Sequence, residues 1–166
     1  MIDEKTFLEF IQYWRDLATS HVDIMDFAHG GTREINQISK SDLDYPCLWL
    51  ETPSLLPKDN NLGNARLQWR TGVAIITSSS KINEALDTQA NPNLARDTLY
   101  NSTYLIALDI MRKIKKDYRE AKLELRINTV SLDPIDQLFV DNVIGWRLEV
   151  SMDFNFNLAY NPAKFV

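Results

Sequence analysis

The sequence is poor in the residues that form covalent links and metal sites. It has one cysteine, Cys47, and two histidines, His21 and His29, among 166 residues. A single cysteine cannot form an intrachain disulfide, which excludes a scaffold that depends on such links. So few sulfur and imidazole ligands also argue against a structural zinc site, although carboxylate sites for magnesium or calcium stay open. We therefore expect no metal and no cofactor.

Glycine, positive charge and long apolar runs are scarce as well. The five glycines leave little material for a phosphate-binding loop, and the sequence has no Walker loop, nucleophile elbow or dinucleotide fingerprint. The net charge of −5 gives no support for a DNA-binding surface. No apolar run approaches the roughly 20 residues that span a bilayer. Since the acidic start of the sequence is also unlike a signal peptide, we expect an intracellular protein that does not contact a membrane.

What is present predicts a single α+β domain over residues 1–166. Apolar residues make up 45% and charged residues 25%, as in ordinary globular proteins. We expect an N-terminal helix at 4–20, a flexible connection at 28–44 and a core at 45–160. The connection is predicted because residues 32–44 are mostly polar and follow Gly30-Gly31, a pair that permits a sharp change of direction.

Two amphipathic helices are predicted. Apolar residues at three- and four-residue steps indicate the helix at 4–20, which begins either with a capping box from Thr6 and Glu9 or with Asp3 as its N-cap. A longer apolar stripe predicts a second helix over about residues 94–120. Lysine and arginine collect towards its end, where the helix dipole favours cations.

Alternating apolar and polar residues predict four strands. They lie at about 45–51, 66–77, 123–129 and 144–158. We expect them to form an antiparallel or mixed four-stranded sheet that packs against the long helix and the N-terminal helix. Residues 53–64 and 80–93 are predicted to be loops, and Asp133-Pro134-Ile135-Asp136 is predicted to be a turn.

The alternation at 144–158 is the strongest of these patterns. At about 3.3 Å per residue, a strand of this length would extend about 50 Å. Most strands have only about five or six residues. Either this strand bends or bulges, or its far end pairs with something outside the monomer.

Few residues are candidates for catalysis, and each has a simpler structural interpretation. A hydrolase would need Asp133, Asp136 and His29 to meet in one cleft. A turn and a solvated loop histidine explain these residues more simply. Cys47 lies inside a predicted strand, which favours a buried, inert thiol over a nucleophile. We therefore assign no catalytic, cofactor-binding or metal-binding residue, and we expect that the protein is not an enzyme.

The basic residues leave two interpretations open. The cluster at 112–116 is interpreted as a solvated helix face rather than as a nucleic-acid surface. The arginines of the predicted strands could contact nucleic acid or pair with carboxylates on neighbouring strands. These residues are Arg66, Arg70 and Arg147 on one side and Glu51 and Glu149 on the other.

The aromatic residues also leave two interpretations open. All four tryptophans, Trp14, Trp49, Trp69 and Trp146, are predicted to lie in the core. The alternative is a cytoplasmic module that binds a small ligand between helix and sheet. Its pocket would be lined by Trp69, Trp146, Phe154 and Phe156. A filled core around these rings would exclude that pocket.

The order of elements and a few short motifs resemble a known group of proteins. Tyr45-Pro46 opens a short strand that ends at Glu51, and the long helix contains Asp109-Ile110-Met111-Arg112-Lys113-Ile114. An Asp-Pro-Ile turn and Gly145-Trp146-Arg147-Leu148-Glu149 follow. Over roughly residues 40–160 the chain resembles neck and tail-completion proteins of tailed bacteriophages, including tail terminators, in the versions carried by phages of Bacteroidetes-type hosts.

The resemblance implies a structural virion protein. Such α+β subunits assemble into a ring, often of six or twelve copies, between the portal and the tail. The resemblance further implies contacts with adjacent neck, portal and tail proteins, assembly in the host bacterial cytoplasm, and passage of DNA through the ring without specific binding. It carries over no catalytic residue. An acidic subunit is consistent with a channel to which DNA does not adhere.

Overall fold

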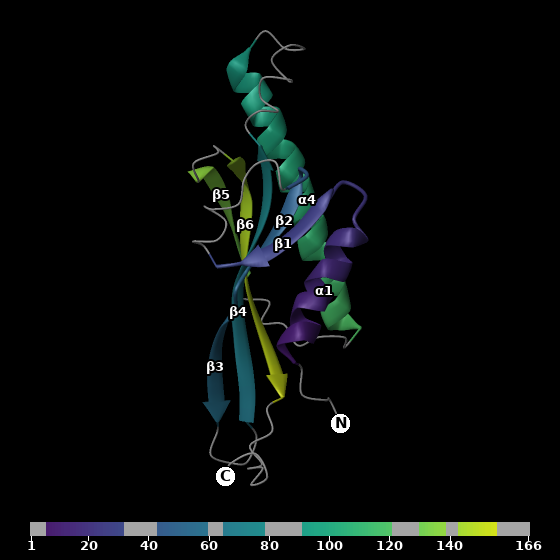
Figure 1. Cartoon of the computed structure of the whole chain (residues 1–166), viewed down its shortest axis with the longest axis vertical. Coiled ribbons are helices and arrows are strands. Elements are labelled where there is room, and N and C mark those ends of the chain that lie inside the picture. The colour runs from purple at the N-terminus through teal and green to yellow at the C-terminus, as the bar shows by residue number, and fades with distance from the viewer. Residues whose placement is uncertain are drawn as a thin grey trace.

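The computed structural model describes residues 6–31, 43–59, 65–78, 91–120, 130–138 and 143–155. In these ranges the chain has the predicted α+β class, with two helices and six strands that form one mixed sheet. The sheet is therefore larger than the four strands that the sequence predicts. Both helices pack on the same face of the sheet (Figure 1). We call the opposite face, which neither helix covers, the outer face.

The elements follow one another as α1 (Phe7–Thr19), β1 (Asp26–Gly30), β2 (Cys47–Glu51), β3 (Ser54–Asp59), β4 (Ala65–Ser78), α4 (Pro92–Arg119), β5 (Ser131–Leu138) and β6 (Val143–Asn155). The strand order is β1-β2-β4-β6-β5, and β3 pairs with the first half of β4. β1 and β2 are parallel, whereas the other pairs are antiparallel.

α1 begins with the capping box that the sequence predicts. The Thr6 hydroxyl accepts a hydrogen bond from the backbone N–H of Glu9, and the Glu9 carboxylate accepts one from the backbone N–H of Thr6. Asp3, the alternative N-cap, lies outside the described residues. The helix buries one apolar stripe against the sheet, formed by Phe10, Ile11, Trp14, Leu17 and Ala18.

α4 begins two residues before its predicted start because Asn91 caps it. The Asn91 side chain accepts a hydrogen bond from the backbone N–H of Asn93. Pro92 occupies the first turn, where its missing N–H would have no partner within the helix. The helix ends at Arg119, close to the predicted end.

The two longest strands pair with each other along their length. β4 has 14 residues and β6 has 13, and their register runs from Arg66 opposite Asn155 to Ser78 opposite Val143. The extended conformation predicted for the last strand is confirmed as far as Asn155, and residues 156–158 lie outside the described part. The described far end of β6 pairs with β4 inside the monomer. The length of the strand therefore gives no indication of a partner.

Three predictions of irregular structure were wrong, because β1, β3 and β5 are strands. β1 overlaps the predicted connection, β3 lies in the predicted loop 53–64, and β5 contains the predicted turn at Asp133–Asp136. Each is an edge strand of the described sheet, because it pairs with one neighbouring strand. Pro57 and Pro134 are tolerated there because such a strand has N–H positions that need no partner. The predicted strand at 123–129 and residues 32–42 of the predicted connection lie outside the described residues.

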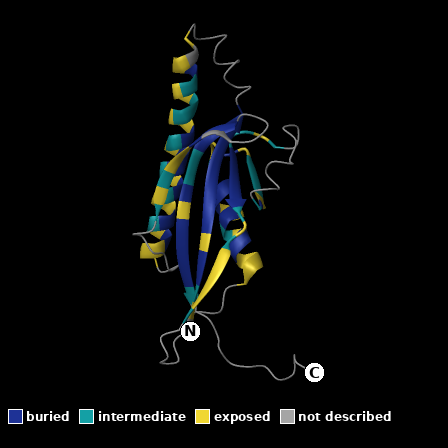
Figure 2. Cartoon of the chain, turned by 90° about the vertical axis from the view of Figure 1, so that its left-hand side faces the viewer, coloured by how far each residue is buried: buried dark blue, intermediate teal, exposed yellow. Residues whose placement is uncertain are grey.

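Two apolar clusters lie on the two faces of the sheet. The larger fills the space between helices and sheet, and Trp14, Trp69 and Ile75 are among its buried residues. The smaller lies on the outer face and consists of Cys47, Trp49, Ala74, Ile76, Ile135 and Val143. The central strands are accordingly buried along most of their length (Figure 2). Three tryptophans are buried as predicted, whereas Trp146 is half-buried.

Candidate functional site

The residues considered for hydrolysis do not come together. His29 lies on β1 and Asp133 on β5, at opposite ends of the strand order. Four steps of about 4.8 Å between neighbouring strands separate them by roughly 19 Å. Both side chains are exposed, which confirms the solvated histidine although it lies in a strand rather than in a turn. The side chain of Asp136 lies outside the described part of the molecule.

The Cys47 thiol is buried, as predicted. The side chain is fully shielded from solvent and forms no disulfide. Its pKa is raised to about 12, mainly by burial and to a smaller extent by the nearby Asp26 carboxylate. Because the thiolate is the nucleophilic form, Cys47 is unreactive near neutral pH.

The basic cluster of α4 forms ion pairs along its own helix. The pairs are Arg112 with Asp109, Lys113 with Asp117, and Lys116 with Glu120. The three basic side chains are exposed. This arrangement confirms the interpretation of residues 112–116 as a solvated helix face.

One of these pairs also connects the two helices. The Asp117 carboxylate is buried, and it accepts hydrogen bonds from Lys113 on α4 and from the Tyr13 hydroxyl on α1 at 3.2 Å. Burial raises the pKa of Tyr13, and the Asp117 charge raises it further. This contact orients α1 against α4, so its role is structural.

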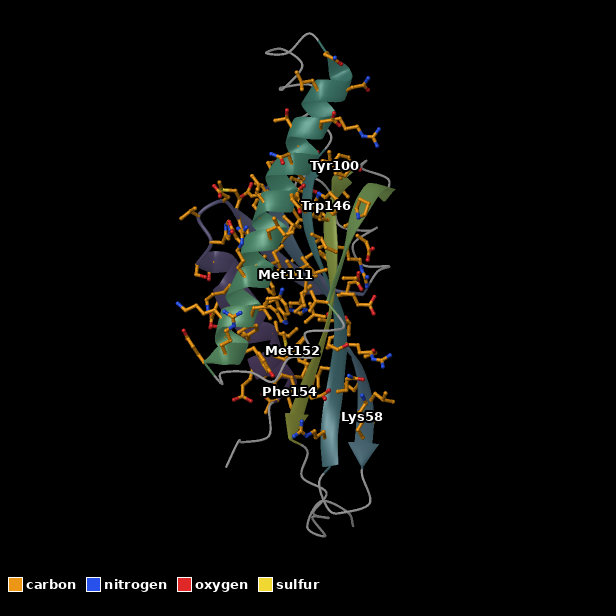
Figure 3. The ribbon with its side chains drawn as sticks, turned by 180° about the vertical axis from the view of Figure 1, so that it is seen from behind. Lys58, Tyr100, Met111, Trp146, Met152 and Phe154 are labelled. Carbon is orange, nitrogen blue, oxygen red and sulfur yellow. The ribbon has the colours of Figure 1, made fainter. Side chains whose placement is uncertain are left out.

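The aromatic rings considered for a ligand pocket lie in a packed core. Trp69 contacts Phe10 at 4.7 Å between ring centroids and also contacts Phe154. Trp146 lies beside Tyr100, whose carbonyl accepts a 3.0 Å hydrogen bond from the indole N–H (Figure 3). Phe156 lies outside the described residues. The described rings thus pack against other aromatic side chains, and none of them lines the pocket described next.

An open pocket of about 380 Å³ lies instead between the end of α1 and the start of β1. Its wall is formed by Arg15, Ala18, Thr19, Ile24, Met25, Asp26 and Phe27. The Arg15 guanidinium lies over the Phe27 ring, 5.5 Å from its centroid. The pocket is thus mostly apolar, with one cation and one carboxylate at its wall.

The outer face carries one of the cross-strand ion pairs that the sequence suggests. Arg147 donates from Nε to Glu51 Oε1 at 2.6 Å and from Nη2 to Glu51 Oε2 at 2.8 Å. Such a bidentate pair fixes the orientation of both groups. Glu149 lies 3.5 Å from the same guanidinium. The hydrogen bond with Glu51 is the main reason that the pKa of Arg147 is raised.

Gly72 provides the space for this pair. A Cβ atom at Gly72 would collide with the Glu51 carboxylate and the Arg147 guanidinium. The β4–β6 register continues through Gly72 opposite Glu149, so the glycine permits close approach rather than a bulge. The ion pair therefore lies flat against the backbone of β4.

The outer face has a positively charged end, which we call the basic end. It is formed by Lys58 on β3 and by Arg66 and Arg70 on β4, and both arginines are exposed. Lys58 lies directly opposite Arg66 and points away from the helices (Figure 3). Asp153 is the acidic side chain described on this part of the face, and it is buried.

The other end of the outer face is negatively charged, and we call it the acidic end. Here Glu51 and Glu149 contact the Arg147 guanidinium, and Asp133 lies directly opposite Arg147 in the β5–β6 register. The three carboxylates and Arg147 give this end a net charge of −2, whereas three cations and Asp153 give +2 at the basic end. The outer face, with these two ends, is the candidate functional site.

Sequence reasoning missed Lys58 and Asp133 as members of this face because it placed both outside strands. Register is the signal that could have found them. Each lies directly opposite an arginine on the neighbouring strand, Arg66 and Arg147 respectively. The pairing partners of β3 and β5 had to be known before these charges could be assigned to one surface.

Comparison with protein families and with curated proteins gives no match. No family model matches the chain, and no curated protein matches it. Among the described residues, no group of three or more histidine, cysteine, aspartate or glutamate side chains could hold a metal ion. Neither of the two described helices combines the length and the apolar character needed to cross a membrane.

Proposed function

We propose that the chain is a structural subunit of a tailed-bacteriophage virion. In this proposal it forms a ring of six or twelve copies at the neck, as a tail terminator or head–tail connector. The ring joins the portal to the tail, contacts the adjacent neck and tail proteins, and lets DNA pass without specific binding. The subunit is assembled in the host bacterial cytoplasm and acts by binding other proteins rather than by catalysis.

The outer face is the observation that carries this proposal. Its charged side chains are spread over five strands and two ends, and the described residues considered for catalysis, His29 and Asp133, do not converge in a cleft. Catalytic sites are usually concave and bring a few polar groups together. A broad sheet face with polar, exposed charges is instead typical of the rim of a protein–protein interface.

The motifs behind the phage resemblance have structural reasons in this fold. A Cβ atom at Gly145 would collide with the carbonyl oxygen of Ile75, so β4 and β6 can approach closely only with glycine there. Trp146 then donates its N–H to Tyr100 on α4. Gly145-Trp146 thus joins the last strand to its neighbour and to the long helix. The motif residues therefore have structural roles in this chain, and the function is proposed from the sequence resemblance.

The most decisive test of the proposal is to find the chain in particles. Mass spectrometry of purified virions should detect it at six or twelve copies per particle, and imaging should locate it at the neck. Light scattering on concentrated protein should show oligomers. A chain that stays monomeric at high concentration and is absent from virions would contradict the proposal.

A second candidate function, small-ligand binding, is favoured by the pocket beside α1. Its volume of about 380 Å³ lies within the usual range of ligand sites. A thermal-shift screen of metabolites should then find a compound that stabilises the wild type. Replacing the exposed Thr19 with Trp would fill the pocket and should abolish that shift. A compound that stabilises both proteins equally binds elsewhere.

A further inference from the structure

The charge on the outer face is divided in a way that limits what can cover it. A DNA duplex presents phosphates along its whole length, so it would be attracted by the basic end and repelled by the acidic end. A uniformly acidic or uniformly basic protein surface would meet the same conflict. The partner that fits has a divided charge of its own, placed in the opposite direction.

We infer that two copies of this chain pair through their outer faces, with the basic end of each copy against the acidic end of the other. The inference rests on the proposed function in one respect, namely that the chain acts by assembly, and it names a contact other than the head-to-tail contacts that close a ring. The same two ends serve both copies, so the contact is isologous and has two-fold symmetry.

The register of the strands supports this arrangement. Asp133 lies level with Ala74, through Arg147, and is thus four residues beyond Arg70 along β4. Arg66 and Lys58 lie four residues before Arg70, at about 13 Å in the other direction. A two-fold axis that crosses the strands at Thr71 therefore brings Arg70 of one copy level with the partner's Glu149, and places Arg66 and Lys58 within two residues of the level of the partner's Asp133.

The outer face also offers apolar area at the same place. Leu56 on β3 lies opposite Gln68 on β4, between the levels of Lys58 and Arg70, and its exposed fraction is 45%. A partner over the basic end would bury this leucine, which favours association in the absence of any charge effect. The charges would then set the direction of pairing and reject the parallel alternative, because complementary charges give specificity more than affinity.

Charge reversal at each end tests the inference. Two variants are needed, K58E/R66E/R70E at the basic end and D133K/E149K at the acidic end. The control is R112E/K115E/K116E on α4, which makes the same change in charge as the basic-end variant but away from the sheet. Circular dichroism verifies that each variant is folded, and sedimentation velocity measures self-association at about 50 mM and 500 mM salt.

We expect the wild type to self-associate and to do so less at the higher salt, because salt screens exposed charges. Each reversal should weaken self-association on the order of a hundredfold, since like charges then face each other across the interface. An equimolar mixture of the two reversed variants should associate again, because one outer face is then acidic and the other basic. The α4 control should behave as the wild type does.

Three results would overturn the pairing. The first is a mixture of the two variants that stays monomeric. The second is an oligomer that neither reversal weakens, which would leave assembly and the proposed function intact but move the contact to another surface. The third is loss of binding to a non-specific DNA duplex in K58E/R66E/R70E with self-association unchanged, which would make the basic end a nucleic-acid surface.

Discussion

The two faces of the sheet use the same strands for different purposes. On the covered face, α1 and α4 bury aromatic and branched side chains, and Trp14 and Ile75 are fully buried there. On the outer face a smaller apolar cluster lies beside charges that occupy two separate ends. The difference suggests that stability comes mainly from the covered face, whereas recognition depends on the outer face. Four substitutions test that division, and their effects should decrease in the order given.

The largest effect is expected for Trp14→Ala on the covered face. Trp14 is fully buried against Phe10 and Tyr13, and emptying such a site costs about 3–5 kcal/mol of the free energy of unfolding. Urea denaturation followed by circular dichroism measures the loss. Trp14→Phe is the control, because the buried Trp14 Nε1 has no hydrogen-bond partner in the described part and its removal offsets some of the lost packing. Equal losses in the two variants would contradict the explanation.

A smaller effect is expected for Gly145→Ala on the outer face. The new Cβ atom would collide with backbone, the Ile75 carbonyl, which cannot rotate away. Overpacking of this kind costs about 1–3 kcal/mol. Gly72→Ala is the matched comparison, since the atoms nearest to its Cβ atom are the ends of the Glu51 and Arg147 side chains, which can move. If Gly72→Ala lowers the thermal midpoint more than Gly145→Ala does, the ability of neighbouring side chains to move does not determine the cost of the added Cβ atom.

The third prediction concerns alkaline pH and the thiol of the outer cluster. The pKa of Cys47 rises from 9.0 to about 12 on folding, so the neutral thiol is favoured in the folded state. The neutral thiol contributes its full share to the free energy of unfolding below pH 9, and this contribution is lost as the pH rises towards 12. At pH 10 the loss is about 1.4 kcal/mol at most. Denaturation at several pH values should show a shallower decline for Cys47→Ala, and identical slopes would refute the assignment.

The smallest effect is expected for the ion pair over Gly72. Glu51→Gln removes the charge of a half-buried bidentate partner of Arg147 and should cost about 1 kcal/mol. The more exposed Glu149 lies farther from the guanidinium, so Glu149→Gln should change stability by less than about 0.5 kcal/mol. Chemical denaturation distinguishes the two, and a larger effect at Glu149 would reverse their proposed roles.

Strong periodic patterns made much of the covered face predictable. The stripe of α1, the capping box at Thr6 and the alternation in β6 each follow from local sequence, and the structure has all three. β3 and β5 were not predicted because they contain Pro57 and Pro134. A central strand does not tolerate proline, whereas an edge strand does. β1 escaped because it is short and ends in glycine.

The candidate site was harder to predict than the fold because it depends on register. Arg147 was correctly paired with Glu51 as one option, yet 96 residues separate them and no local pattern identifies the partner. Lys58 and Asp133 join the outer face only through the pairing of β3 and β5. Charge on a sheet surface is thus a property of the topology, and composition recorded only a net charge of −5.

The uninterrupted pairing of β4 and β6 has a mechanical consequence. Both strands run from the core to the basic end with their register unbroken from Ser78 to Arg66. A flexible joint would need a bulge, a proline or a gap in the ladder, and this pair has none of them. A pull or twist at the basic end is therefore transmitted along two hydrogen-bonded strands into the centre of the sheet. Under such a load, β4 and β6 would move together as one rigid unit.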